Sequence, residues 1–164
     1  MSQPPGRLRV ELPTAQDTWE LGHRIGVLVM AGDLVVLTGP LGAGKTVLAQ
    51  GVGAGLGVLS GVISPTFVLA RVHREGRIPF VHVDAYRLGG LAELDDLDLD
   101  TDQAEAVTVV EWGAGLAERL AAEHLTVELQ RHPTRELRVA QLHPSGPSWR
   151  HRLPGLAGRT GARR

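Results

Sequence analysis

Apolar residues at helical spacing mark the first regular element of the chain. One helical face carries the apolar residues Leu21, Ile25 and Leu28. Thr14 precedes this stretch as a candidate N-cap, and Asp17 follows three residues later, where it can complete a capping box. The pattern therefore predicts a helix that begins after Thr14 and ends near residues 31–32.

The next segment changes from helical spacing to an unbroken apolar run. Leu34–Thr38 is rich in branched residues, which is typical of a strand buried on both faces, and it leads directly into Gly39. Residues 44–56 alternate small and apolar side chains in a way that fits a helix, and Gly57 offers its end. A strand, a glycine-rich turn and a helix are thus predicted in succession.

Extended segments dominate the remainder of the chain. Further runs of apolar and β-branched residues predict strands at 67–72, 78–83, 106–110, 125–129 and 137–142. Glu75 and Gly76 suit a hairpin turn between the first two of these, and a helix is predicted at 114–123. This order predicts an α/β, three-layer domain with a mainly parallel sheet and antiparallel additions at one side.

Length and composition fit one compact domain. The chain has 164 residues, of which 43% are apolar, enough to bury a core. We expect the folded domain to span residues 1–145. Residues 146–164 combine arginine with glycine and proline, so we expect them to form a basic, disordered tail.

Overall charge and residue usage exclude several classes of partner and site. The formal net charge is -1 and the pI about 6.7, so no global basic field attracts the chain to nucleic acid or anionic lipid. Cysteine is absent, which excludes disulfides and thiolate zinc sites. No apolar run approaches the roughly 20 residues of a membrane helix, and the first residues lack the apolar core of a signal peptide. We therefore expect a cytoplasmic protein.

A phosphate-binding motif lies between the predicted strand and helix. The pattern G-x-x-x-x-G-K-[ST] is matched by Gly39, Pro40, Leu41, Gly42, Ala43, Gly44, Lys45 and Thr46. The glycines allow backbone N–H groups to turn toward phosphate oxygens, and the helix N-terminus adds partial positive charge. Lys45 is placed to reach the β and γ phosphates, and Thr46 to bind Mg²⁺. We therefore predict a magnesium-nucleotide site.

The lysine of this motif stands out in the composition. Lys45 is the single lysine among 17 basic residues, the others being arginine. A slim, flexible ammonium suits a phosphate-binding loop, whereas a planar guanidinium does not. The absence of a second lysine also argues against a GTPase, because the guanine-reading motif Asn-Lys-x-Asp requires one.

Two carboxylates directly follow predicted strands. Asp84 comes after the run that ends at Val83, and Glu111 comes after the run that ends at Val110. Open α/β sheets bind ligands beyond the carboxyl ends of their strands, so each carboxylate is a candidate for the second half of the magnesium site. Capping of the following segment is the alternative for either one alone.

Other polar features are open to two interpretations. Residues 64–66, Ser-Pro-Thr, fit either a loop that senses the γ-phosphate or a plain turn. The acidic residues between 93 and 105 fit a solvated surface or a docking surface for a basic partner. Trp112 fits packing or an interface anchor, and His82 is interpreted as structural.

Four motifs follow one another along the chain: the glycine-rich loop at 39–46, Ser-Pro-Thr-Phe at 64–67, His-Val-Asp-Ala-Tyr-Arg-Leu at 82–88 and Val-Glu-Trp at 110–112. Together they resemble the TsaE family, bacterial ATPases of tRNA threonylcarbamoyladenosine synthesis. The motifs occur in the family's order, and the resemblance spans roughly residues 12–142. It implies a small P-loop ATPase with ATP and Mg²⁺ as cofactors, slow by itself, that binds TsaB and TsaD. Its ATP cycle would support threonylcarbamoyl transfer to the adenosine beside the anticodon of tRNAs that read ANN codons, with tRNA reached only through the complex.

The resemblance also implies roles for individual catalytic and metal-binding residues. Thr46 and Glu111 would hold Mg²⁺. Asp84 would organise or activate the attacking water. Lys45 and the loop amides would hold the phosphates.

Two further positions correspond to residues that flank the nucleotide base in the family. They are Thr14, before the first helix, and Arg135, on the late strand pair. The chain departs from the family at Pro40, where an acidic residue is usual, and in its basic tail. Because Pro40 has no N–H, one potential phosphate donor is absent.

Two other functions compete with this interpretation. A small-molecule kinase shares the size, the P-loop and the sheet, but it needs an acceptor pocket and usually an arginine-bearing lid, for which no candidate stands out. A nucleotide-gated scaffold would bind ATP without turnover. Asp84, which suits activation of water, argues against the scaffold.

Overall fold

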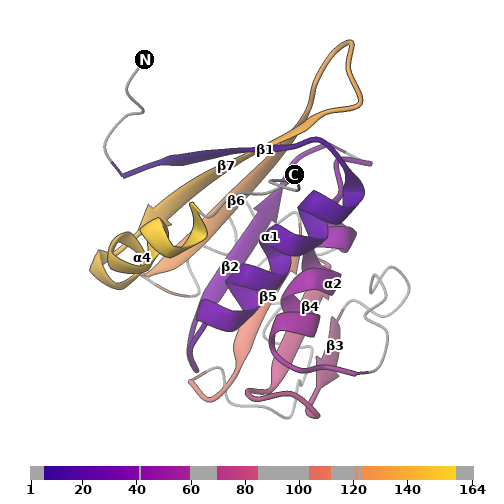
Figure 1. Cartoon of the computed structure of the whole chain (residues 1–164). Coiled ribbons are helices and arrows are strands. Elements are labelled where there is room, and N and C mark those ends of the chain that lie inside the picture. Colours follow the sequence, from indigo (N-terminus) through magenta and orange to yellow (C-terminus); the bar gives the residue numbers. More distant parts are fainter. Residues whose placement is uncertain are drawn as a thin grey trace.

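The structure, a computed structural model, describes residues 6–40, 42–59, 70–84, 104–111, 121 and 123–157. Its elements are, in chain order (Figure 1), β1 Leu8–Leu12, α1 Ala15–Leu28, β2 Leu34–Thr38, α2 Lys45–Gly55, β3 Ala70–His73, β4 Phe80–Asp84, β5 Val107–Glu111, β6 His124–Arg131, β7 Arg138–Ser145, α4 Pro147–Arg152 and the 3₁₀ helix η2 Leu153–Leu156. Several predictions fall outside the described residues: the roles of residues 64–66, of the acidic segment and of Trp112, and most of the helix expected at 114–123. Within the described part of the chain, no helix has the length and apolar character that crossing a membrane requires.

One sheet organises the described strands. Their order is β1-β7-β6-β2-β5-β4-β3. The central strands β6, β2, β5 and β4 run parallel, whereas β7 with β1 at one end and β3 at the other are antiparallel additions. The predicted mainly parallel sheet is partly right, since three of the six described strand pairings are parallel and three are antiparallel. The antiparallel additions were predicted at one side, and that detail is wrong. Additions occur at both edges because the β3–β4 and β6–β7 hairpins extend opposite ends of the parallel block.

β1 is a strand that the sequence interpretation missed. Its apolar residues Leu8, Val10 and Leu12 alternate with charged residues, and Leu12 is fully buried. The strand pairs with β7 along its length, from Leu8 opposite Leu142 to Leu12 opposite Arg138. The period-2 alternation was the available signal.

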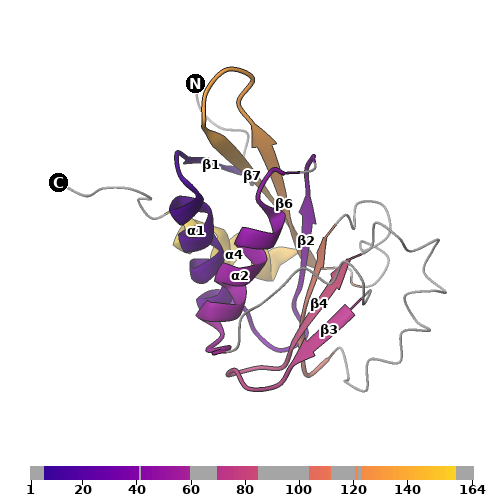
Figure 2. The ribbon, with the colours of Figure 1, turned by 90° about the vertical axis from the view of Figure 1, so that its right-hand side faces the viewer.

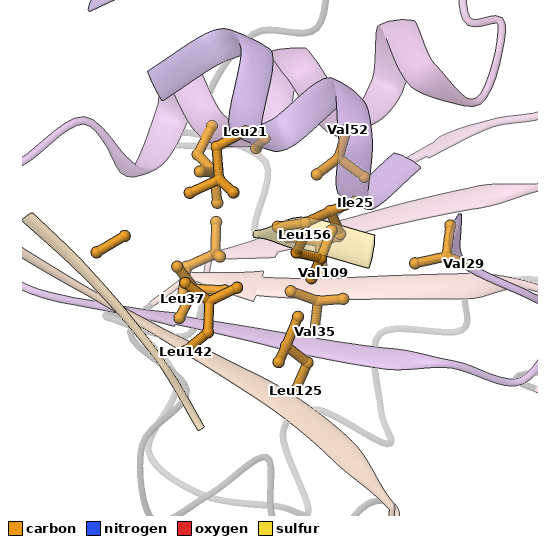
Figure 3. Close-up of a cluster of buried hydrophobic side chains, with 14 of the residues drawn as sticks. Leu21, Ile25, Val29, Val35, Leu37, Val52, Val109, Leu125, Leu142 and Leu156 are labelled. Atoms are coloured by element: carbon orange, nitrogen blue, oxygen red, sulfur yellow. The ribbon is translucent and has the colours of Figure 1, made fainter. Parts of the chain in front are cut away.

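The main core lies between the sheet and the helices on one face (Figure 2). Leu21 and Ile25 of α1 and Val52 of α2 point toward Val35 and Leu37 of β2 (Figure 3). A smaller apolar cluster covers the opposite face: Leu34, Val36, Val81, Val83, Ala106 and Val110. β2 thus contributes alternate residues to both clusters, which confirms its prediction as a strand buried on both faces. The helix predicted at 114–123 lies largely outside the described residues, so the predicted third layer stays a prediction.

The two helices of this layer are in direct backbone contact through glycines. A Cβ built on Gly51 of α2 would lie 2.1 Å from the carbonyl oxygen of Trp19, and one built on Gly22 of α1 would lie 2.1 Å from that of Leu48. Gly26 and Gly55 meet in the same way one turn further on. These glycines therefore allow α1 and α2 to approach more closely than any residue with a side chain would permit.

The predicted capping box of α1 is confirmed. The backbone N–H of Asp17 donates to Thr14 Oγ1 at 3.2 Å, and the backbone N–H of Thr14 donates to Asp17 Oδ2 at 2.9 Å. The helix ends at Leu28, a little before the predicted end. Arg77 caps this end, because its guanidinium donates to the carbonyl oxygens of Gly26 and Val29.

Residues 147–156 form α4 and η2, so the prediction of a disordered tail from residue 146 onward is wrong for this segment. Trp149 and Leu156 are fully buried in the main core. Arg152 pairs with both carboxylate oxygens of Asp33 and lies 3.9 Å from the centre of the Trp149 ring. The segment is basic in composition but amphipathic in structure, because Arg152 forms an ion pair while the apolar residues pack into the main core.

Candidate functional site

The glycine-rich loop joins the end of β2 to the start of α2, as predicted. The N-cap of α2 is Gly44, which has no side chain to cap the helix, in contrast to the N-cap Thr14 of α1. An anion is a common partner for such a helix end, because backbone N–H groups and the positive end of the helix dipole point toward it. The local structure therefore fits a phosphate site.

Gly39 is required where the loop leaves β2. Its φ is +139°, and an added Cβ would lie 2.3 Å from the carbonyl oxygen of Leu129 on β6. The neighbouring strand thus leaves no space for a side chain, and the backbone conformation disfavours one. This is the physical reason for the first glycine of the motif.

Lys45 is folded back onto its own loop. Its Nζ donates to the carbonyl oxygen of Gly39 at 2.8 Å and to that of Pro40 at 2.9 Å. Only 5% of the residue is exposed, and this burial lowers the pKa of the ammonium, whereas the nearby carboxylates of Glu111 and Asp84 raise it. A buried cation in this position gains from an anionic ligand, so the lysine is suited to bind a polyphosphate.

The remaining loop residues occupy distinct environments. Ala43 is fully buried, and its N–H donates to the Pro40 carbonyl at 3.1 Å. Pro40 thus supplies an acceptor to the loop although it has no N–H to donate. Gly42 and Gly44 both have positive φ values. Leu41, also predicted to bind the nucleotide, lies outside the described residues.

The two candidate carboxylates lie side by side at the strand ends. Asp84 of β4 is the register partner of Glu111 on β5, and both are more than nine-tenths buried. β5 also pairs with β2, so Glu111 is the one that borders the loop. Thr46 Oγ1 donates to Glu111 Oε1 at 3.4 Å. The structure therefore brings Glu111 to the hydroxyl of Thr46 and leaves Asp84 one strand further away.

A histidine contacts the second oxygen of Glu111. His82 Nε2 lies 2.5 Å from Glu111 Oε2, and the histidine is fully buried. Sequence reasoning interpreted His82 as structural. The available signal was its position two residues before Asp84, which places both side chains on the same face of β4.

Thr14 and Arg135 lie on segments that border the loop. The first turn of α1 is near Gly44, because Thr18 Cγ2 lies 3.5 Å from the position of a Cβ on that glycine. Arg135 is exposed in the loop between β6 and β7, which Figures 1 and 2 show at the same end of the sheet as the glycine-rich loop. The structure thus places Thr14 at the start of the helix that approaches Gly44, and Arg135 in a hairpin loop at the same end of the sheet as the glycine-rich loop.

Arg138 is a further residue near the loop that sequence reasoning missed. Its Nη2 donates to the carbonyl oxygen of Gly42 at 3.3 Å. Arg131, its register partner on β6, approaches the same glycine, with Nη1 3.5 Å from the position of an added Cβ. This proximity depends on the hairpin register, which no local sequence pattern reveals.

The donor set fits a magnesium ion held mainly by a nucleotide. Within the described residues, no group of three or more histidine, aspartate or glutamate side chains could hold a metal without further ligands. Thr46 and Glu111 together offer a hydroxyl and a carboxylate oxygen. Mg²⁺ in nucleotide sites takes few protein ligands and fills the remaining positions with phosphate oxygens and water. The residues present therefore fit this ion together with a polyphosphate.

Comparison with known proteins relates this site to one family. A profile described as "Threonylcarbamoyl adenosine biosynthesis protein TsaE" matches residues 12–139. The tRNA threonylcarbamoyladenosine biosynthesis protein TsaE of Mycobacterium tuberculosis is 54% identical over 138 residues, which cover 79% of this chain and 82% of that protein. The protein of the same name from Mycobacterium leprae is 56% identical over 134 residues, which cover 76% of this chain and 83% of the relative.

The fold agrees with this relationship. The crystal structure of YdiB from Bacillus subtilis superposes with a TM-score of 0.78 and 26% sequence identity, covering 95% of this chain and 97% of YdiB. The P-loop α/β fold predicted from the sequence is confirmed. The chain belongs to the TsaE family, whose members act in the biosynthesis of threonylcarbamoyladenosine in tRNA.

Proposed function

We propose that this protein is a magnesium-dependent ATPase that acts with TsaB and TsaD. It supports formation of the threonylcarbamoyl group on the adenosine beside the anticodon of tRNAs that read ANN codons. The observation that carries the proposal is the convergence of Lys45, Thr46 and Glu111 at the junction of β2 and α2. Family membership supports the role in tRNA modification, and the geometry of the site supports the nucleotide chemistry.

The polar groups of the site divide the work of binding. The Lys45 ammonium, held beside the loop carbonyls, exchanges these contacts for the β and γ phosphates. The amides of the loop and of the first turn of α2 bind the remaining phosphate oxygens. The hydroxyl of Thr46 and the carboxylate of Glu111 would hold Mg²⁺, which would supply positive charge beside the phosphates.

Asp84 has a separate role in this proposal. It lies next to Glu111 across the β4–β5 pair and is 8% exposed. A carboxylate in this position accepts a hydrogen bond from water and orients it toward the terminal phosphate. Thr14 and Arg135 border the adenine base. The protein reaches tRNA only through its complex with TsaB and TsaD, in the cytoplasm.

The proposal is tested by measuring phosphate release from ATP with and without TsaB and TsaD. We expect slow release from the isolated protein, clear stimulation by the two partners together, and loss of the stimulated rate in Asp84→Asn. Absence of stimulation would refute the role with these partners. If TsaB and TsaD stimulated ATP binding without any phosphate release, a nucleotide-gated scaffold would be favoured instead.

A further inference from the structure

We infer that His82 is a positioning residue for the magnesium site, acting through Glu111. It holds the Glu111 carboxylate in the orientation that the metal requires. This inference rests on the proposed function, since it assigns a role within the same nucleotide site.

The two oxygens of Glu111 have different partners. Oε1 accepts from Thr46 Oγ1 at 3.4 Å, and Oε2 lies 2.5 Å from His82 Nε2. Because the carboxylate is the acceptor, the histidine nitrogen donates. A donor fixed on one oxygen restricts rotation of the carboxylate and keeps the other oxygen beside Thr46. The hydrogen bond from His82 to Oε2 therefore leaves Oε1 as the Glu111 oxygen that is available to a metal.

The contact with Glu111 is the main polar interaction of the His82 ring. The residue is fully buried, and within the described part of the chain its Nδ1 has no hydrogen-bond partner. Its ring stacks on Phe80, with 5.8 Å between the ring centres and 15° between the ring planes. Burying a polar ring costs free energy unless its hydrogen bonds compensate, so an apolar residue would be the simpler choice for packing alone.

The register of β4 and β5 explains why the contact between His82 and Glu111 forms below the loop. His82 pairs in register with Val109, and Asp84 pairs with Glu111. Both pairs lie on the face of the sheet that carries α1 and α2, since Phe80 and Val109 belong to the main core. His82 therefore lies one layer below the loop, between the core and the carboxylate. Residues in this relation to a metal ligand orient it without touching the metal.

The inference is tested with ATP binding to the isolated protein by calorimetry, first in EDTA and then at increasing MgCl₂. His82→Phe keeps a ring beside Phe80 and removes the donor. We expect this substitution to raise, by about 10- to 100-fold, the MgCl₂ concentration at which the effect of magnesium on ATP binding is half-maximal. Affinity for ATP in EDTA should remain within about threefold of wild type, because the phosphate-binding groups are unchanged.

Conservative variants separate the hydrogen bond from packing. The amide of His82→Gln reaches the position of Nε2, so its magnesium requirement should return toward the wild-type value. His82→Asn is too short to do so and should resemble His82→Phe. His73→Phe is the matched control, since His73 also stacks on Phe80, and it should leave the magnesium requirement unchanged. The Gln and Asn pair decides the matter if His82→Phe melts below the assay temperature.

A double variant tests whether His82 acts through Glu111. In a Glu111→Ala background, His82→Phe should add no further change to the magnesium requirement. An unchanged requirement in folded His82→Phe, or equal shifts in the Gln and Asn variants, would overturn the inference and leave the proposed function intact. If magnesium has no effect on ATP binding by the wild-type protein, the proposed metal site fails and the inference fails with it.

Discussion

At the scale of single residues, the site is defined by which carboxylate meets the loop. By position alone, Asp84 and Glu111 were equivalent candidates, each at the end of an apolar strand, and only the family resemblance gave them different roles. The structure distinguishes them because β5, and not β4, lies beside β2. Thr46 contacts Glu111 as a result. The strand order therefore assigns the two carboxylates different surroundings that their local sequences do not reveal.

This assignment predicts the behaviour of Glu111→Ala. Removal of the carboxylate that we propose as a Mg²⁺ ligand should lower the partner-stimulated rate of phosphate release by at least about tenfold, and excess Mg²⁺ should restore part of it. ATP binding in EDTA should persist, because Lys45 and the loop are unchanged. Steady-state phosphate release over a magnesium series measures both effects.

Glu128→Ala provides the control for Glu111→Ala. Glu128 is also a carboxylate on a strand next to β2, but its side chain is 40% exposed and contacts Gln130 and His143. We expect its magnesium dependence to match wild type. Equal rates for Glu111→Ala and wild type would contradict the metal role.

At the scale of elements, the α1–α2 pair explains the glycines of α2. Gly51 and Gly55 lower intrinsic helix propensity, and the sequence offered no reason for them. In the structure, a Cβ added to either glycine would lie 2.3 Å or less from a backbone oxygen of α1. Close approach of the two helices thus outweighs helix propensity, and it fixes α2, whose first turn carries Lys45 and Thr46.

Gly51→Ala tests this packing. Alanine favours a helix over glycine by about 1 kcal/mol, but here its methyl group would overlap the Trp19 carbonyl oxygen. Because a backbone atom cannot move aside, we expect a net loss of about 1–3 kcal/mol in the free energy of unfolding. Ala54→Gly, on the same helix, reports the propensity effect alone, a loss of about 1 kcal/mol. Urea denaturation measures both, and a more stable Gly51→Ala would rule out the close contact.

The C-terminal helix gives a second test at this scale. Trp149 of α4 is fully buried in the main core, so Trp149→Ala should lower the free energy of unfolding by about 3–5 kcal/mol. Arg150 is exposed on the same helix, and Arg150→Ala should change it by less than about 0.5 kcal/mol. Similar denaturation midpoints for the two variants would show that α4 is dispensable for folding.

At the scale of the whole molecule, the sequence predicted those features that depend on local pattern. The strand Leu34–Thr38, the loop and its helix, and the capping box at Thr14 all follow from spacing between near neighbours. Features that depend on pairing between distant segments were missed. They include the position of β3 at the opposite edge from β1, the contact of Arg138 with Gly42 and the contact of His82 with Glu111.

The tail shows a different limit of sequence reasoning. Arginine, glycine and proline are typical of disorder when taken as composition. Trp149, Leu153 and Leu156 nevertheless pack on the core, and Arg152 pairs with Asp33, which lies far away in the sequence. A short segment can therefore be ordered by a few tertiary contacts that its composition does not predict.

Calorimetric titration with ATP and MgCl₂ measures directly whether the glycine-rich loop and the Lys45 ammonium bind a polyphosphate. Wild type should release heat on saturable binding of one nucleotide per chain. Lys45→Ala should lose this signal while keeping the wild-type circular dichroism spectrum, because the described hydrogen bonds of the Lys45 ammonium go to loop carbonyls and the residue belongs to neither apolar cluster. Absence of binding heat and of thermal protection in wild type, or undiminished affinity in Lys45→Ala, would contradict the account.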